Sequence, residues 1–340
     1  MKYSVALCTF NGQDFITEQL ESIFSQTIPP QQIVICDDRS DDDTVDIIRK
    51  IAENHPQIDW KIIVNEQNLG VVRNFEKAIS LCDHEWVFLS DQDDWWLPEK
   101  AEKIFAFAEK KKKSVIFSDA LLVDEKLESM GKTMFENIRF FQPERKGFYK
   151  GNNARGLLLR KSLVTGATLA FKANVVKSFF PVPENDYFIH DGWIATLAAC
   201  INELGFVDEP LILYRQHANQ KIGGKLDQNL EMRDEIFWEQ RLGLPLNAKK
   251  TDRITASIKT FGERENVIYE FVKTHSEKFP AETLKFLSVR RKLAQQLLNK
   301  PKGMLQRLKC LSLKLYFYKL VEFQTFRRFL GNSFHYLRNS

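Results

Sequence analysis

Short apolar runs alternate with segments of helical spacing over roughly the first 120 residues. Apolar runs rich in β-branched and aromatic residues are typical of strands, whereas apolar residues repeated every three or four positions indicate helices. The predicted strands are 3–8, 32–36, 60–64, 85–89 and 115–117, and the predicted helices are 14–25, 43–54, 71–82 and one starting at Pro98. This alternation predicts an α/β fold with a largely parallel sheet and helices on both faces.

The alternation stops after residue 120. Residues 120–160 are mixed, polar and glycine-containing, which predicts a long loop region over a binding site. A strand over 164–171, an apolar helix starting at His190 and a short strand from Leu211 are expected next. From about Leu226 helical spacing continues to the end of the chain. We therefore expect an α/β domain over 1–222 and a mainly helical region over 223–340.

The composition is that of a folded, soluble protein. Of 340 residues, 44% are hydrophobic and 28% charged, which argues against a disordered chain. Residues 1–10 are apolar but meet the polar residues 11–14 too early for a signal peptide, and no apolar run reaches the ~18 residues of a spanning helix. The cysteines are odd in number and lack metal-ligand spacing: Cys8, Cys36, Cys82, Cys200 and Cys310. We expect free thiols and a cytoplasmic protein.

Charge is distributed unevenly along the chain. Residues 290–340 carry twelve Lys and Arg and one Glu, a net +11, so that −7 remains for residues 1–289 in a chain of net +4. Leu308, Leu311, Leu315 and Tyr318 share one helical stripe of this basic tail. A basic helix with an apolar face suits the surface of an anionic membrane. The alternatives are packing onto the catalytic body and formation of a dimer or other oligomer; no nucleic-acid-binding module is present.

Polar residues follow each predicted strand, and in parallel sheets these positions share one ligand-binding edge. There is no dinucleotide-binding G-x-G-x-x-G and no P-loop. A carboxylate after the second strand can accept the N3–H of uracil or thymine. Asp91 and Asp93 lie on one side of an extended segment and suit Mg²⁺ or Mn²⁺ bridging a diphosphate. The sequence thus predicts a site for a pyrimidine nucleotide and a divalent cation.

Four segments occur in an order that resembles family 2 glycosyltransferases of the GT-A fold. They are VALCTFNG, VICDDRSDDDT, NLGVVRNFE and LSDQDDWW. SDQDD-x-W followed much later by YRQH-x-x-N resembles the bacterial rhamnosyltransferase-like branch. The resemblance covers about residues 1–222 and implies a nucleotide-sugar-dependent transferase.

The resemblance also implies roles for individual residues. The nucleotide-binding residues would be Thr9, Phe10, Asn11, Asp38, Asn68, Arg73, Asp91 and Arg215. Asp93 and His217 would hold Mn²⁺ or Mg²⁺, and Asp191 would be the general base that takes the proton of the acceptor hydroxyl. Gly166, His190 and Trp193 would lie beside the acceptor. The position of His190 is usually Glu in relatives, which leaves its role open.

Structural roles compete with several of these assignments. Asp41, Asp42 and Asp43 can cap the following helix, and Asp191 can cap its own. Gly166 can serve close packing, Trp95 and Trp96 can belong to the core, and His217 can be a surface-loop histidine.

The combined prediction is an inverting, metal-dependent glycosyltransferase acting at the inner face of the cytoplasmic membrane. It would move a single sugar, with L-rhamnose from dTDP-rhamnose as the leading donor and a UDP-sugar as the other, onto a glycan or lipid-linked acceptor. The chain lacks the Q-x-x-R-W motif of processive relatives. One rival is a nucleotidyltransferase, whose glycine- and arginine-rich triphosphate loop is missing from TFNGQD. The other is an inactive nucleotide-sugar-binding scaffold at membranes.

Overall fold

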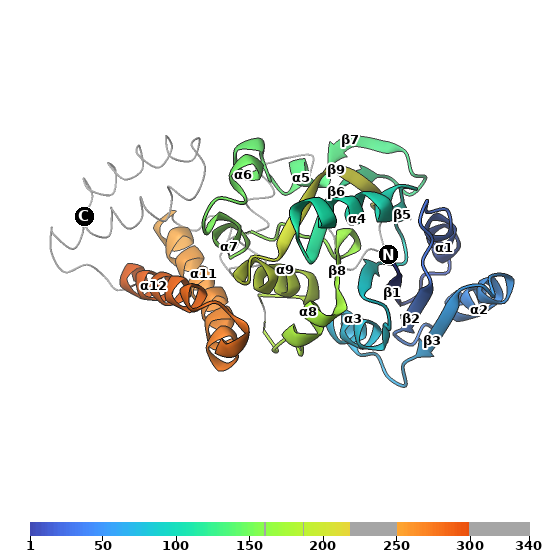
Figure 1. Ribbon diagram of the computed structural model, residues 1–340, viewed down its shortest axis with the longest axis horizontal. Coiled ribbons are helices and arrows are strands. Elements are labelled where there is room, and N and C mark those ends of the chain that lie inside the picture. The colour runs from blue at the N-terminus through green and yellow to red at the C-terminus, as the bar shows by residue number, and fades with distance from the viewer. Residues whose placement is uncertain (160, 186, 218–249, 299–340) are drawn as a thin grey trace. The chain divides into compact units, whose positions relative to one another are not determined.

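The computed structural model describes residues 1–159, 161–185, 187–217 and 250–298 (Figure 1). The chain divides into two compact units, which are described separately. The first comprises the described residues of Met1–Phe148 and Ser162–Leu226, and the second comprises those of Tyr149–Lys161 and Asp227–Ser340. The predicted boundary at residue 222 falls outside the described residues and stays a prediction.

Four parallel strands begin the first unit. These are β1 (Tyr3–Thr9), β2 (Gln32–Asp37), β3 (Asp59–Val64) and β4 (Trp86–Ser90), joined by the helices α1 (Ile16–Phe24), α2 (Thr44–Asn54) and α3 (Gly70–Leu81). Their parallel register aligns Thr9 with Asp37 and Leu7 with Ser90. The strands therefore end together at one edge, and α3 packs on β1 and β2. The alternation predicted from the sequence is confirmed for this region.

The rest of the sheet is mixed, so the prediction of a largely parallel sheet holds for its first half. The strand order is β3-β2-β1-β4-β8-β6-β9-β5, with β7 paired to β6. The added strands are β5 (Trp95–Trp96), β6 (Val115–Val123), β7 (Ser129–Thr133), β8 (Ala170–Lys172) and β9 (Leu204–Arg215). β8 runs antiparallel to both β4 and β6, whereas β6 and β9 are parallel. Two longer helices of this unit are α4 (Lys100–Lys111) and α9 (His190–Cys200).

Residues 120–160 are not the long loop that the sequence predicted. β6 continues to Val123, β7 forms a hairpin with it, and α5 (Met134–Asn137), α6 (Gln142–Gly147) and α7 (Asn153–Leu158) follow. The rings of Phe135, Phe140 and Phe148 pack against Phe117 and Phe206 at centroid distances of 5.1–6.4 Å. This aromatic cluster orders a segment whose average composition is polar.

A smaller correction concerns residues 164–171. Gly166–Thr168 form a 3₁₀ turn, followed by the short strand β8 and then α8 (Ala173–Val176) and a second 3₁₀ turn (Lys177–Phe179).

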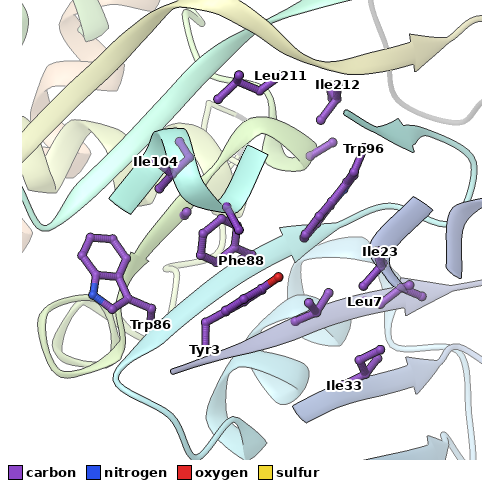
Figure 2. Close-up of a cluster of buried hydrophobic side chains, with 14 of the residues drawn as sticks. Tyr3, Leu7, Ile23, Ile33, Trp86, Phe88, Trp96, Ile104, Leu211 and Ile212 are labelled. Atoms are coloured by element: carbon purple, nitrogen blue, oxygen red, sulfur yellow. The ribbon is translucent and has the colours of Figure 1, made fainter. Parts of the chain in front are cut away.

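The core lies between the sheet and its helices. Figure 2 shows Tyr3, Phe88, Trp86 and Trp96 among the aliphatic side chains of neighbouring strands and helices. The strands β1, β2 and β4 are buried on both faces, which explains why they read as nearly continuous apolar runs. Trp96 is fully buried, with the Lys100 ammonium 3.6 Å from its ring centroid, so the core alternative for this tryptophan is the observed one.

The described part of the second unit is helical, as predicted for this region. α11 (Lys250–Thr274) packs on α12 (Ala281–Leu298), with a 3₁₀ turn (Ser276–Lys278) between them. A buried ion pair joins Arg290 to Glu265, and Arg264 donates to the carbonyl of Leu158 at 3.0 Å. Within the described residues, no helix is both long enough and apolar enough to span a bilayer. The predicted amphipathic stripe of the basic tail lies outside the described residues.

Candidate active site

A pocket of about 570 Å³ lies at the edge where the parallel strands end. Its walls come from the loops after β1, β2 and β4, the start of α3, the 3₁₀ turn at Gly166, the start of α9 and the end of β9. The lining residues are Cys8, Thr9, Phe10, Asn11, Asp14, Phe15, Asp38, Asn68, Gly70, Val71, Asn74, Phe75, Asp91, Gln92, Asp93, Thr165, Gly166, Ile189, His190, Asp191, Tyr214 and His217. Most of the site residues expected from the sequence are in this set: Thr9, Phe10, Asn11, Asp38, Asn68, Asp91, Asp93, Gly166, His190, Asp191 and His217. Arg73, Arg215 and Trp193 are not.

Asp38 follows β2, and its side chain lies at the N-terminus of α3. Its carboxylate accepts hydrogen bonds from the backbone N–H groups of Leu69 at 2.6 Å and Gly70 at 2.9 Å, and from Asn65 Nδ2 at 2.9 Å. Negative charge is stabilised at a helix N-terminus by the exposed N–H groups and the helix dipole. Oδ2 accepts only one of these bonds from the described residues, so it keeps a further acceptor position.

The preceding residue, Asp37, has a different role. Its carboxylate accepts from the Ser40 backbone N–H at 2.8 Å, and from the hydroxyls of Thr9 and Ser40 at 2.6 Å each. Asp37 is fully buried in this turn, so its oxygens hold the loops after β1 and β2 together. Asp42 has the helix-capping role that the sequence left open, since its carboxylate accepts the Thr44 N–H at 3.0 Å at the start of α2.

The three carboxylates that follow β4 point to different surroundings. Asp91 and Asp93 line the pocket, whereas Asp94 is buried and accepts the Arg215 backbone N–H at 3.1 Å. Burial, with Asp93 and Asp191 nearby, raises the pKa of Asp91 to about 7. Burial, with Asp93 and Asp91 nearby, raises the pKa of Asp94 well above its usual range. Asp94 is thus a structural residue, and negative charge accumulates around Asp91 and Asp93.

Asp93 pairs with His217 at the edge of the sheet. Asp93 Oδ2 lies 2.8 Å from His217 Nε2, and the two side chains are 13% and 6% exposed. The His217 ring also packs on Phe15, with centroids 4.7 Å apart. His217 is therefore a buried pocket residue and not a surface-loop histidine.

Asp191 and His190 open α9 beside Gly166. Asp191 accepts the N–H of Gly192 at 2.5 Å. His190 is 3% exposed, stacks on Phe75 with centroids 4.2 Å apart, and has no hydrogen-bond partner on either ring nitrogen among the described residues. Burial lowers the pKa of His190 to about 3, so its ring is neutral near pH 7. A Cβ on Gly166 would lie 3.0 Å from His190 Nε2, which explains why a residue without a side chain stands there.

Two arginines expected to contact the nucleotide are placed elsewhere. Arg73 pairs with Glu76 at 2.6 Å and lines a separate hollow on α3, outside the pocket. Arg215 is 2% exposed; its guanidinium donates to the carbonyls of Asp93 and Glu125 and pairs with Glu18. With three of its N–H donors directed at these groups, the buried Arg215 side chain holds the segment after β4 and lies outside the pocket.

Trp193 also lies outside the pocket. Its ring is fully buried, its Nε1–H donates to the carbonyl of Phe179 at 2.8 Å, and it packs on Phe188. The expected contact with the acceptor is therefore corrected to a core role, because α9 turns this residue away from the pocket that His190 and Asp191 face.

Among the pocket residues that were not expected from the sequence, three have contacts or positions that matter for the site. Phe75 supports the His190 ring, Tyr214 lines the wall at the end of β9, and Gln92 holds the loop after β1. Gln92 stands inside the motif DQDD, but a single glutamine between carboxylates has no distinctive signal. Phe75 and Tyr214 have the apolar spacing of ordinary core positions.

Comparison with known proteins identifies the family. The family model described as Glycosyl transferase family 2 matches residues 4–174, half of the chain. The dTDP-rhamnosyl transferase RfbG of Shigella flexneri is 25% identical over 65% of this chain and 74% of its own length. Two uncharacterized glycosyltransferases of Haemophilus influenzae are 31% and 24% identical over 34% and 64% of this chain. The matches span 44% and 66% of those two relatives.

Solved structures show the same fold. A structure of residues 1–349 of TarS from S. aureus has a TM-score of 0.51 at 18% identity, and covers 87% of this chain and 92% of the TarS chain. A second TarS structure, in complex with UDP-GlcNAc, has a TM-score of 0.51 at 16% identity, over 88% and 90% of the two chains. The expected GT-A-like α/β fold is thus confirmed. The chain belongs to glycosyl transferase family 2 and is a glycosyltransferase.

Proposed function

We propose that this glycosyltransferase moves a single sugar, with inversion and with the help of Mn²⁺ or Mg²⁺, from a pyrimidine nucleotide-sugar to a hydroxyl of a glycan or lipid-linked acceptor. One observation carries the proposal. A single pocket brings together Asp38 at a helix N-terminus, the pair Asp93 and His217, and Asp191 at the start of α9. These are the three groups that base recognition, metal binding and proton removal require.

The nucleotide end of the pocket is formed by Asp38 with Thr9, Phe10, Asn11 and Asn68. Asp38 keeps an acceptor position that suits the N3–H of uracil or thymine, and the backbone N–H groups of Leu69 and Gly70 hold its carboxylate in place. The similarity to a dTDP-rhamnosyl transferase supports dTDP-rhamnose as the first donor to test. UDP-sugars are the second, because uracil presents the same N3–H edge.

The residues at the other end fit a divalent cation. Asp93 and His217 supply one carboxylate oxygen and one imidazole nitrogen, and the neighbouring Asp91 has a raised pKa that a cation would lower. Within the described residues, no three His, Cys, Asp or Glu side chains form a complete ligand set. Two protein ligands suit Mg²⁺ or Mn²⁺, which take their remaining ligands from water and substrate phosphates. When bound, the ion would neutralise the charge that develops on the leaving diphosphate.

Asp191 is the proposed general base. Its carboxylate takes the proton of the acceptor hydroxyl as that oxygen attacks the anomeric carbon from the face opposite the nucleotide, so the configuration inverts. His190 and Gly166 lie next to it. The unpartnered nitrogens of the neutral His190 ring suit hydrogen bonds to sugar hydroxyls, which makes His190 the proposed substrate-positioning residue.

Calorimetric binding of dTDP and UDP, each with and without Mn²⁺, tests the proposal. We expect binding that requires the metal in the wild type and is lost in Asp93→Ala, with the better nucleotide identifying the base. The matching nucleotide-sugars are then tested for turnover. If neither nucleotide binds under any metal condition, the proposal fails.

Membrane association is proposed from the charge of the chain alone. The net +11 of residues 290–340 favours attraction to anionic lipids at the inner face of the cytoplasmic membrane. Sedimentation with vesicles of anionic and of neutral lipid tests this. Equal sedimentation with both kinds of vesicle, or none with either, contradicts it.

A further inference from the structure

The loop after β1 is held by side chains from the loop after β2. The backbone N–H groups of Asn11 and Gly12 donate to the hydroxyls of Ser40 and Thr44, each at 2.8 Å. These contacts fix one side of the loop that carries Phe10, which lines the pocket.

Gln92 holds the same loop from the opposite side. The Phe10 N–H donates to Gln92 Oε1 at 2.8 Å, and Gln92 Nε2 donates to the Phe10 carbonyl at 3.1 Å. The carboxamide therefore pairs with both backbone groups of one residue, as a neighbouring strand would. Two simultaneous bonds fix the orientation as well as the position of Phe10 relative to Gln92.

Gly12 makes this close approach possible. A Cβ at Gly12 would lie 2.3 Å from Gln92 Oε1 and 2.4 Å from Gln92 Cδ, which is nearer than non-bonded atoms can come. The need for glycine is one of space, since its φ is not in the left-handed region. The Gln92 side chain thus lies packed flat against the backbone of the nucleotide loop.

The backbone of Gln92 belongs to the segment that carries Asp93, the proposed metal ligand. It stands between Asp91 and Asp93, and all three residues line the pocket. A shift of Phe10 is therefore transmitted through two hydrogen bonds to the segment that carries Asp93, and Asp93 is itself paired with His217.

Resting on the function proposed above, we propose that Gln92 is a positioning residue that couples the two ends of the pocket. A nucleoside beside Thr9 and Phe10 and a divalent cation at Asp93 favour each other's binding through the contact between Gln92 and Phe10. Such a coupling is reciprocal, because each ligand must change the affinity for the other by the same factor.

Binding of nucleosides distinguishes coupling through the protein from direct contact between the ion and the phosphates. Thymidine and uridine lack the diphosphate, so a divalent cation can raise their affinity only through the protein. We would measure their dissociation constants by NMR titration, using diamagnetic Mg²⁺ in place of Mn²⁺, together with those of dTDP and UDP by calorimetry with either ion. In the wild type we expect the cation to tighten nucleoside binding about fivefold or more, the lower end of typical couplings.

Three variants test the contact from both sides. Gln92→Met keeps the length of the side chain and removes both hydrogen bonds, and Gln92→Glu keeps the acceptor and loses the donor. Gly12→Ala displaces the carboxamide without altering residues 91–93. We expect the nucleoside coupling factor to fall to about one in Gln92→Met and Gly12→Ala, and to an intermediate value in Gln92→Glu. The double variant of Gln92→Met and Gly12→Ala should show no further loss, because both changes break one contact.

The outcomes separate this inference from the proposed function. If dTDP and UDP fail to bind under all metal conditions, the proposed function falls. If they bind with metal, but the wild type shows no nucleoside coupling or Gln92→Met retains it, then only the coupling role of Gln92 is wrong. A melting temperature for each variant identifies any that do not fold, and Gly12→Ala then supplies the test for a Gln92 variant lost in this way.

Discussion

The Asp93 carboxylate and the His217 imidazole lie 2.8 Å apart, although 124 positions separate them in the chain. The short strand β5 brings them together by pairing antiparallel with β9, where Trp95 aligns with Leu213. The Arg215 N–H then donates to Asp94, which continues this pairing to the end of β9. The proposed metal site therefore depends on the pairing of two strands distant in the chain and not on one motif.

Removing either member of this pair should have the same consequence. We expect His217→Ala and Asp93→Ala each to weaken Mn²⁺-dependent dTDP or UDP binding at least about tenfold, and the double variant to be little worse than either alone, because the two residues serve one ion. Calorimetry of the wild type, the two single variants and the double variant gives a double-mutant cycle. Additive losses would mean that the two residues act separately. His84→Ala is a control at a histidine outside the pocket.

Asp191→Asn should separate chemistry from binding. The amide keeps the size of the side chain but cannot take a proton, so we expect turnover to fall by about 10²–10⁴-fold with nucleotide affinity changed less than about threefold. Initial rates with the best donor, together with nucleotide calorimetry, make the comparison. Asp43→Asn, at the N-terminus of α2, is the matched control and should retain full turnover. Near-normal turnover in Asp191→Asn would exclude Asp191 as the base.

Asp38→Asn should alter the choice of base. An asparagine amide can donate to the N3 of cytosine, which lacks the proton that Asp38 is proposed to accept. We expect affinity for UDP and dTDP to fall about tenfold or more and the ratio of CDP to UDP affinity to rise. Equal losses for all three nucleotides would show that Asp38 only supports α3 through Leu69 and Gly70.

His190→Phe should make stability less sensitive to acid while impairing transfer. Burial lowers the pKa of His190 from 6.5 to about 3, so between these values the unfolded chain takes up a proton that the folded chain does not. The contribution of His190 to stability therefore falls as the pH drops from 6.5 toward about 3. Free energies of unfolding in urea should decline more steeply with falling pH in the wild type than in His190→Phe, by up to about 1.4 kcal/mol per pH unit. Parallel declines would contradict a buried neutral histidine.

Arg215→Met should reduce stability and leave phosphate recognition intact. The buried guanidinium donates to the carbonyls of Asp93 and Glu125, which the variant leaves without these bonds. We expect a loss of about 2–4 kcal/mol in the free energy of unfolding, measured by urea denaturation. The ratio of nucleoside diphosphate to nucleoside affinity, measured below the melting temperature with saturating Mg²⁺, should not change. A large fall in that ratio would show that Arg215 contacts the diphosphate after all.

Local patterns in the chain are enough to specify the α/β alternation, the ligand-binding edge and the family. Strands buried on both faces are continuous apolar runs, and each is followed at once by its polar loop. The family motifs lie in those same loops. Asp38, Asp93 and Asp191 are therefore identifiable as pocket residues from the sequence alone.

Which of several similar side chains face the pocket depends instead on tertiary contacts. Asp37 and Asp38 are neighbours in the chain, yet their carboxylates have different roles. Asp37 accepts hydrogen bonds from Thr9 and Ser40, whereas Asp38 lines the pocket at the start of α3. Arg215 finds its carboxylate, Glu18, 197 positions away, and no local pattern carries that information. The role of a polar side chain is set by the partners that surround it, and in this protein those partners come from strands and loops distant in the chain.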